Sequence, residues 1–123
     1  KPYILHPLRV MFKCSTEEEQ IVAVLHDVLE DQIKFSEWTS TLDKWGFSNT
    51  INEAILAISK RPGETNKEYW IRIRANDLAT RVKLKDMEDN CSEERLAVLK
   101  EGEQKYLRNK YAQLKEFLQN GNN

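Results

Sequence analysis

The 123-residue sequence has few of the residues that build disulfide-rich or turn-rich folds: two cysteines, three prolines and four glycines. Cys14 and Cys91 lie far apart and form no Cys-x-x-Cys pattern. They are too few for a disulfide framework, which suits a reducing cytosol. We interpret both as small, half-buried packing residues.

The sequence also lacks an excess of charge and a long apolar run. Nineteen basic residues face twenty acidic ones, which disfavours a nucleic-acid polymer as a partner. The longest uninterrupted apolar run, 21–25, is far short of the roughly 20 residues that cross a bilayer. With no charged-then-apolar leader at Lys1, we expect a soluble, cytoplasmic protein with no membrane partner.

Apolar residues recur at helical spacing along the chain, and no stretch alternates polar and apolar residues as a strand would. The length suits one domain with a real core. We therefore predict a single all-α domain, 1–123, with about seven helices wrapped around a central one. The pattern predicts a helix from Pro7, a central helix over 17–31 and a short helix that runs from a Ser36 cap to Gly46. Three more helices are predicted: one that begins at Asn49 or Thr50, one over 67–75 that Asn66 caps, and one over 78–90 that Asp77 caps. A C-terminal helix pair follows, with a break at Gly102 and a stop at Gly121.

The central helix combines strong apolar character with a cluster of polar side chains. Thr16 and Glu19 fit a capping box at its start. On a helix, His26 and Glu30 share a face, as do Asp27 and Asp31. Charges on so apolar an element are costly unless they are paired or bind a metal, and imidazole beside carboxylate is a ligand set for Mn, Fe or Zn. The stretch 24–31 therefore predicts the middle of a metal site.

The only two histidines, His6 and His26, prove little separately, since a lone histidine on a helix is more often a core residue than a ligand. Together with their neighbours they carry a resemblance. Stretch 3–10, the sequence His-Asp-Val-Leu-Glu-Asp at 26–31, and stretch 82–90 are similar, in that order, to the three motifs of the RelA/SpoT-type branch of the HD-domain metal-dependent phosphohydrolases. Short stand-alone members of that branch also resemble this chain at 61–64, Tyr69, 74–76 and 81–84.

The resemblance implies an enzyme that removes the 3′ pyrophosphate of the guanosine alarmones (p)ppGpp with Mn²⁺. It implies four metal ligands from three helices: His6, His26, Asp27 and Asp86. Because His26 and Asp27 diverge by about 100° around their helix, both reach one ion only from the groove between them. Such a nitrogen and oxygen set leaves open positions and favours Mn²⁺ over a closed tetrahedral zinc.

Two further groups of residues receive roles from the resemblance. Glu30 and Asp31 would be the catalytic acidic pair, and Asn90, one turn beyond Asp86, would contact the nucleotide. Among the basic residues we expect Lys60, Arg61 and Lys83 to contact the small-molecule nucleotide substrate. Solvated surface charge is an equally good interpretation of Lys60 and Arg61, and a helix end reaching solvent is the alternative for Glu30 and Asp31.

The sequence departs from the family pattern at three places. Gln32 replaces the usual Thr or Ser, the pair 88–89 is acidic where it is commonly basic or aromatic, and the chain enters its first motif at Lys1 without the family's first helix. These departures leave two alternatives open. One is an HD phosphohydrolase acting on another nucleotide or phosphate ester, and the other is a catalytically silent helical module that binds nucleotide or metal.

Overall fold

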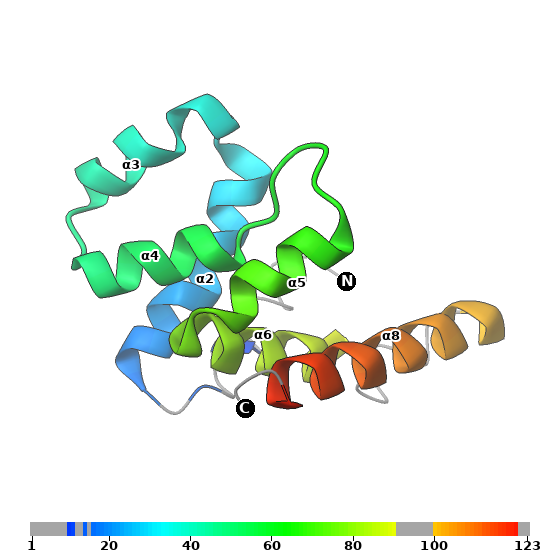
Figure 1. Cartoon of the computed structure of the whole chain (residues 1–123). Coiled ribbons are helices and arrows are strands. Elements are labelled where there is room, and N and C mark those ends of the chain that lie inside the picture. Colours follow the sequence, from blue (N-terminus) through cyan, green and yellow to red (C-terminus); the bar gives the residue numbers. More distant parts are fainter. Residues whose placement is uncertain (1–9, 12–13, 15, 91–99, 121–123) are drawn as a thin grey trace.

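The computed structural model describes residues 10, 11, 14, 16–90 and 100–120, and every regular element within them is helical (Figure 1). The all-α prediction is therefore confirmed for these ranges. None of the described helices has the length and apolar character needed to cross a bilayer. The elements are α2 (Glu17–Gln32), the 3-10 helix η1 (Phe35–Glu37), α3 (Trp38–Trp45), α4 (Asn49–Ile58), α5 (Asn66–Arg74), α6 (Asp77–Asn90) and α8 (Glu101–Asn120).

Helix α2 is the central element and contacts both α4 and α6. Its predicted start is confirmed, because the Thr16 hydroxyl accepts a hydrogen bond from the Glu19 amide at 3.1 Å. At its other end the indole Nε1–H of Trp38 lies 3.1 Å from the carbonyl oxygens of both Leu29 and Ile33. The Leu29 carbonyl also accepts from the Ile33 amide at 3.3 Å, so Trp38 adds a side-chain donor to the turn that carries the acidic pair.

The two sides of α2 have different surroundings. Val22, Ala23 and Leu29 are fully buried against the neighbouring helices. The opposite side, which carries Ile21 and Leu25, opens onto an apolar groove of about 290 Å³. The groove is lined by Met11, Glu17, Gln20, Ile21, Val24, Leu25 and Phe47. His26, Asp27, Glu30 and Asp31 are not among the residues that line this groove.

The predicted caps are displaced by one residue at three helices. Ser36 belongs to η1, so Glu37 is the N-cap of α3. Helix α5 begins at Asn66 because Thr65 forms a reciprocal capping box with Glu68. At the start of α6, the side-chain oxygen of Asn76 accepts from the Ala79 amide at 2.9 Å.

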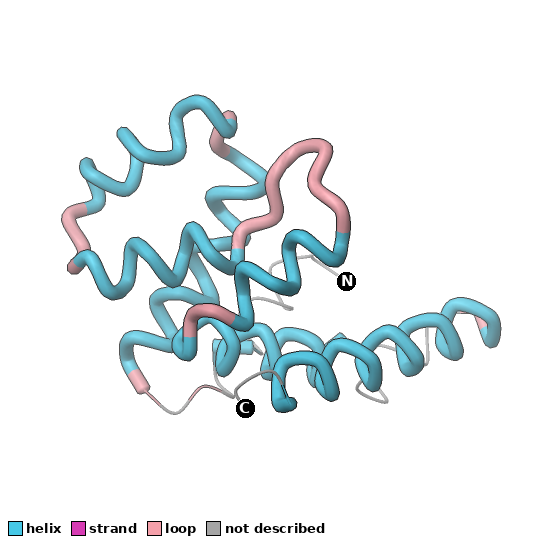
Figure 2. Tube along the Cα trace, viewed as in Figure 1, coloured by secondary structure: helices cyan, strands magenta, loops and turns pink. Residues whose placement is uncertain are grey.

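Helix α8 starts at Glu101, so Gly102 lies in its first turn and not in a break, contrary to the prediction. A glycine is tolerated there because first-turn amides have no intrahelical acceptor to lose. The expected stop at Gly46 is confirmed, with φ of 73° in the left-handed region that glycine adopts without strain. Helix α8 packs against α5 and α6, and its amino-terminal end extends beyond the other described helices (Figures 1 and 2).

Candidate functional site

His26 and Asp27 form the first part of the site, on the buried side of α2. The Nδ1 atom of His26 lies 3.1 Å from the Val22 carbonyl oxygen, and its Nε2 atom lies 3.3 Å from Oδ1 of Asp27. The side chains are only 4% and 13% exposed. A carbonyl can only accept, so Nδ1 donates to Val22, and Nε2 is the ring nitrogen turned toward a carboxylate oxygen. A nitrogen and an oxygen donor side by side in so buried a position suit a bound divalent cation.

Asp86 and Lys83 form the second part, on α6. The Lys83 ammonium lies 3.0 Å from Oδ2 of Asp86, and these side chains are 13% and 8% exposed. Burial lowers the pKa of Lys83, but the Asp86 carboxylate and the Tyr69 hydroxyl together outweigh burial and raise that pKa above its ordinary value. Lys83, which we expected at the substrate, is therefore a permanently charged partner of the expected metal ligand Asp86.

Helices α2 and α6 are joined by a second ion pair at their interface. Nε of Arg81 donates to Oε2 of Glu19 at 3.0 Å. The Glu19 side chain is 4% exposed and that of Arg81 is 54% exposed. Glu19 thus serves the packing of the two helices that carry the site, in addition to its place at the start of α2.

Glu30 is held by the chain that follows α4. The backbone amide of Lys60 donates to Oε1 of Glu30 at 2.6 Å. Burial raises the pKa of Glu30 above its ordinary value and Asp27 adds to this, while the Lys60 amide, His26 and Lys83 oppose it. Glu30 therefore keeps a proton to higher pH than a solvated glutamate, whereas Asp31, its predicted partner, is exposed.

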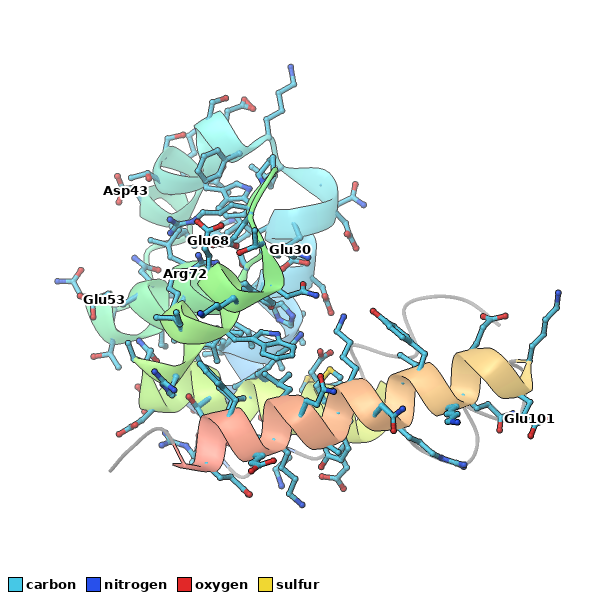
Figure 3. All side chains as sticks on the ribbon, turned by 45° about the vertical axis from the view of Figure 1, so that its right-hand side comes forward. Glu30, Asp43, Glu53, Glu68, Arg72 and Glu101 are labelled. Atoms are coloured by element: carbon cyan, nitrogen blue, oxygen red, sulfur yellow. The ribbon has the colours of Figure 1, made fainter. Side chains whose placement is uncertain are left out.

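Figure 3 shows Glu30 at the level of the first turns of α5, near Glu68 and Arg72. Asp43, Glu53 and Glu101 instead project from the outside of the molecule. Glu30 is therefore set apart from surface carboxylates by its surroundings, as well as by its hydrogen bond to the backbone.

Arg72 of α5 positions the segment that holds Glu30. Its guanidinium donates to the carbonyls of Ala57 at 3.1 Å and Ser59 at 2.9 Å, and forms an ion pair with Glu64. Hydrogen bonding to Arg72 lowers the pKa of Glu64. Because α4 ends at Ile58, these carbonyls need hydrogen-bond donors from outside the helix. No role for Arg72 was predicted from the sequence.

Tyr69 connects this segment to the charged groups of α2 and α6. Its hydroxyl donates to the Ile58 carbonyl at 2.5 Å, and the Lys83 ammonium lies 5.3 Å from the centre of its ring. Burial raises the pKa of Tyr69 to about 12, with Lys83 opposing and Glu30 and Asp86 reinforcing the shift. Tyr69 therefore stands where charges from both helices meet.

Lys60 and Arg61 have different surroundings. The Lys60 ammonium donates to the Asn66 side-chain oxygen at 2.9 Å in an exposed position. The Arg61 guanidinium lies 5.9 Å from the centre of the half-exposed Phe35 ring, and its buried Nε has no hydrogen-bond partner among the described residues. Arg61 thus follows the residue whose amide binds Glu30, and its Nε–H is a donor that the described residues do not use.

The predicted four-ligand set is only partly described. His6 lies outside the described residues, and so does the side chain of Asn90 at the end of α6. Within 16–90, 100–120 and the three isolated residues, no three His, Cys, Asp or Glu side chains are grouped closely enough to hold a metal. Three of the four predicted ligands, His26, Asp27 and Asp86, are described, and they do not form such a group. The four-ligand set therefore stays a prediction.

A scan against known protein families finds no match to this chain, and neither does a search of curated proteins.

Proposed function

We propose that this chain is a metal-dependent phosphohydrolase that removes the 3′ pyrophosphate of (p)ppGpp. The proposal is carried by one observation, the His26–Asp27 contact in a nearly solvent-free position one helical turn from Glu30. The imidazole, whose Nδ1 donates to Val22, presents Nε2 toward a carboxylate, which fits a divalent transition metal. His6 and Asp86 would complete the ligand set.

The roles of the chain's own residues follow from their surroundings. Glu30, held by the Lys60 amide, would take the proton from the attacking water. Its raised pKa brings a carboxylate closer to the value that suits a base near neutral pH. When bound, the metal supplies Lewis-acid polarisation of a phosphoryl oxygen. Asp31, exposed at the end of α2, would act only from the solvent side of the bound substrate.

The direct test is pyrophosphate release from ppGpp by the purified chain with Mn²⁺, compared with Glu30→Gln and Glu53→Gln. Both substitutions remove one carboxylate, but Glu53 is exposed and projects from the outside of the molecule (Figure 3). We expect Glu30→Gln to lose about 100-fold or more in kcat, the size of a general-base contribution, and Glu53→Gln to be unchanged. Absence of release from ppGpp by the unsubstituted chain would refute the assignment.

A substrate panel distinguishes the alarmone from the related alternative, a different nucleotide or phosphate ester. GDP, ATP and a simple aryl phosphate should be turned over at least about tenfold less efficiently than ppGpp if the pocket recognises a 3′ pyrophosphate. Preferential hydrolysis of any of these would keep the phosphohydrolase and replace the substrate.

One observation favours a second candidate, a catalytically silent module that binds nucleotide or metal. The carboxylate of Asp86 is already paired with Lys83 at 3.0 Å. In such a module, Mn²⁺ or nucleotide binding measured by calorimetry would be lost in Asp27→Ala and unaffected in Glu30→Ala, with no turnover of any substrate. Turnover by the unsubstituted chain that disappears in Glu30→Ala would exclude it.

A further inference from the structure

Arg72 and Glu30, both labelled in Figure 3, lie at opposite ends of one peptide group. The carbonyl oxygen of Ser59 accepts from Nη2 of Arg72 at 2.9 Å, and the amide of Lys60, in the same peptide group, donates to Oε1 of Glu30 at 2.6 Å. This peptide is trans and planar, so its C=O and N–H bonds point in opposite directions. A cation of α5 and a carboxylate of α2 are therefore connected through a single peptide group.

The positive charge of Arg72 strengthens the hydrogen bond at the far end of this peptide. A guanidinium that donates to the Ser59 carbonyl draws electron density toward the oxygen, and the Lys60 N–H becomes a stronger donor. Hydrogen bonds that follow one another in this way strengthen each other by roughly 10–30%. The Lys60–Glu30 hydrogen bond therefore depends on Arg72 for its strength as well as for its direction.

The other contacts of Arg72 fix the same segment from two more sides. The guanidinium donates to the Ala57 carbonyl at 3.1 Å and forms an ion pair with Glu64. Oε1 of Glu64 in turn accepts from the Arg61 amide at 3.1 Å, so the peptide group on the other side of Lys60 is anchored too. A planar fork of donors makes all of these contacts at once, which a lysine ammonium does not do.

A fixed Lys60 amide determines how Glu30 is presented to the reacting water. The amide binds Oε1, so Oε2 is the oxygen that would take the proton in the proposed reaction. A general base contributes fully only when it is held within about 0.5 Å of its productive position. Movement of the Lys60 amide would therefore slow proton transfer without changing the groups that contact the substrate.

We infer that Arg72 is a positioning residue for Glu30 and acts through the Ser59–Lys60 peptide. The inference rests on the proposed function, since Glu30 is the base of that reaction. Loss of Arg72 should lower kcat and leave KM nearly unchanged, because Arg72 holds the base and not the substrate. Helix α5 would then contribute to the chemistry through the backbone that follows α4.

Hydrogen exchange of the Lys60 amide, measured by NMR on the full chain without substrate or metal, tests this connection directly. We expect Arg72→Gln to speed this exchange about tenfold, the worth of one hydrogen bond, and Glu30→Ala to speed it at least as much. The amide of the fully buried Val22 reports opening of the whole domain.

Arg74→Gln is the matched control for Arg72→Gln. Arg74 lies on the same helix, is also partly buried, and has its guanidinium 4.1 Å from the Phe117 ring centre, against α8. Its substitution should leave Lys60 exchange within about twofold of the unsubstituted chain. With ppGpp and Mn²⁺, Arg72→Gln should lower kcat about tenfold with KM within about twofold, and Arg74→Gln should change neither.

Lys60 exchange that is unchanged in Arg72→Gln, or that rises no more than Val22 exchange, would overturn the inference. If Arg72→Gln does not fold, Arg72→Lys decides: it keeps the charge without the fork, so Lys60 exchange should rise about threefold, and a value equal to that of Arg74→Lys rejects the inference. The two proposals fail separately. If ppGpp is not hydrolysed, the proposed activity falls and exchange still decides whether Arg72 holds Glu30; if it is hydrolysed with unchanged kcat in Arg72→Gln, only the inference falls.

Discussion

Replacing Lys83 by Met tests whether the Lys83–Asp86 pair is a buried electrostatic unit. The two side chains are 13% and 8% exposed, and the ammonium lies 3.0 Å from the carboxylate. Methionine preserves much of the apolar stem of lysine, so the main loss is the charge. Removing one partner of a buried pair leaves the other without compensation, and we expect the free energy of unfolding to fall by about 3 kcal/mol.

Urea unfolding in the presence of a chelator measures this loss, because a metal ligated by Asp86 would mask it. The double variant Lys83→Met/Asp86→Asn removes both charges and should recover most of the stability, to within about 1 kcal/mol of the unsubstituted chain. Lys105→Met, at an exposed position of α8, should change stability by less than about 0.5 kcal/mol. A loss below about 1 kcal/mol in Lys83→Met, or a double variant no more stable than the single one, would refute the reasoning.

Three further predictions concern groups around the site. The pKa of Glu30 is raised on folding, so its stabilising contribution is full below the ordinary value of 4.5 and is lost as pH rises through the folded-state pKa. In urea unfolding between pH 4 and 8, the free energy of unfolding of Glu30→Gln should therefore decline less with pH than that of the unsubstituted chain. Tyr69→Phe leaves the Ile58 carbonyl without its donor and should lower the free energy of unfolding by about 1–2 kcal/mol in the same assay, and an unchanged value would contradict that hydrogen bond. Burial raises the pKa of Cys14 to about 11, and Glu19 adds to this shift while Lys85 opposes it. In a Cys91→Ser variant, iodoacetamide at pH 8 should therefore react with the Cys14 thiol of the folded chain at least about tenfold more slowly than with that of the urea-unfolded chain.

The helices could be predicted from the sequence because their signals are local. Apolar spacing defines the body of α2, and Thr16 and Gly46 act through side-chain or backbone properties that depend on a few neighbours. The one-residue errors at Ser36 and Asn66 have a common cause. In each case two adjacent residues carry capping groups or turn propensity, and the direction from which the chain enters the helix decides between them.

The candidate site was predictable where one helix supplies the residues. Helical periodicity places His26 one turn from Glu30, whatever the rest of the chain does. The Lys83–Asp86 pair also had a readable signal, since residues three apart on a helix are neighbours. The Lys60 amide had none, because every residue except proline carries an amide donor and only the tertiary fold selects which one reaches Glu30.

Lys110 shows how a position in a packing pattern can carry information that a residue type does not. Residues 105, 108, 110 and 115 are all basic, so α8 reads as a helix with ordinary surface charge. Only Lys110 falls on the face defined by Leu114 and Leu118, and a lysine at such a position loses hydration without gaining a described carboxylate. Leu or Met there would extend the apolar contact at lower cost. Lys110 therefore occupies a position that the helical pattern alone would assign to an apolar residue.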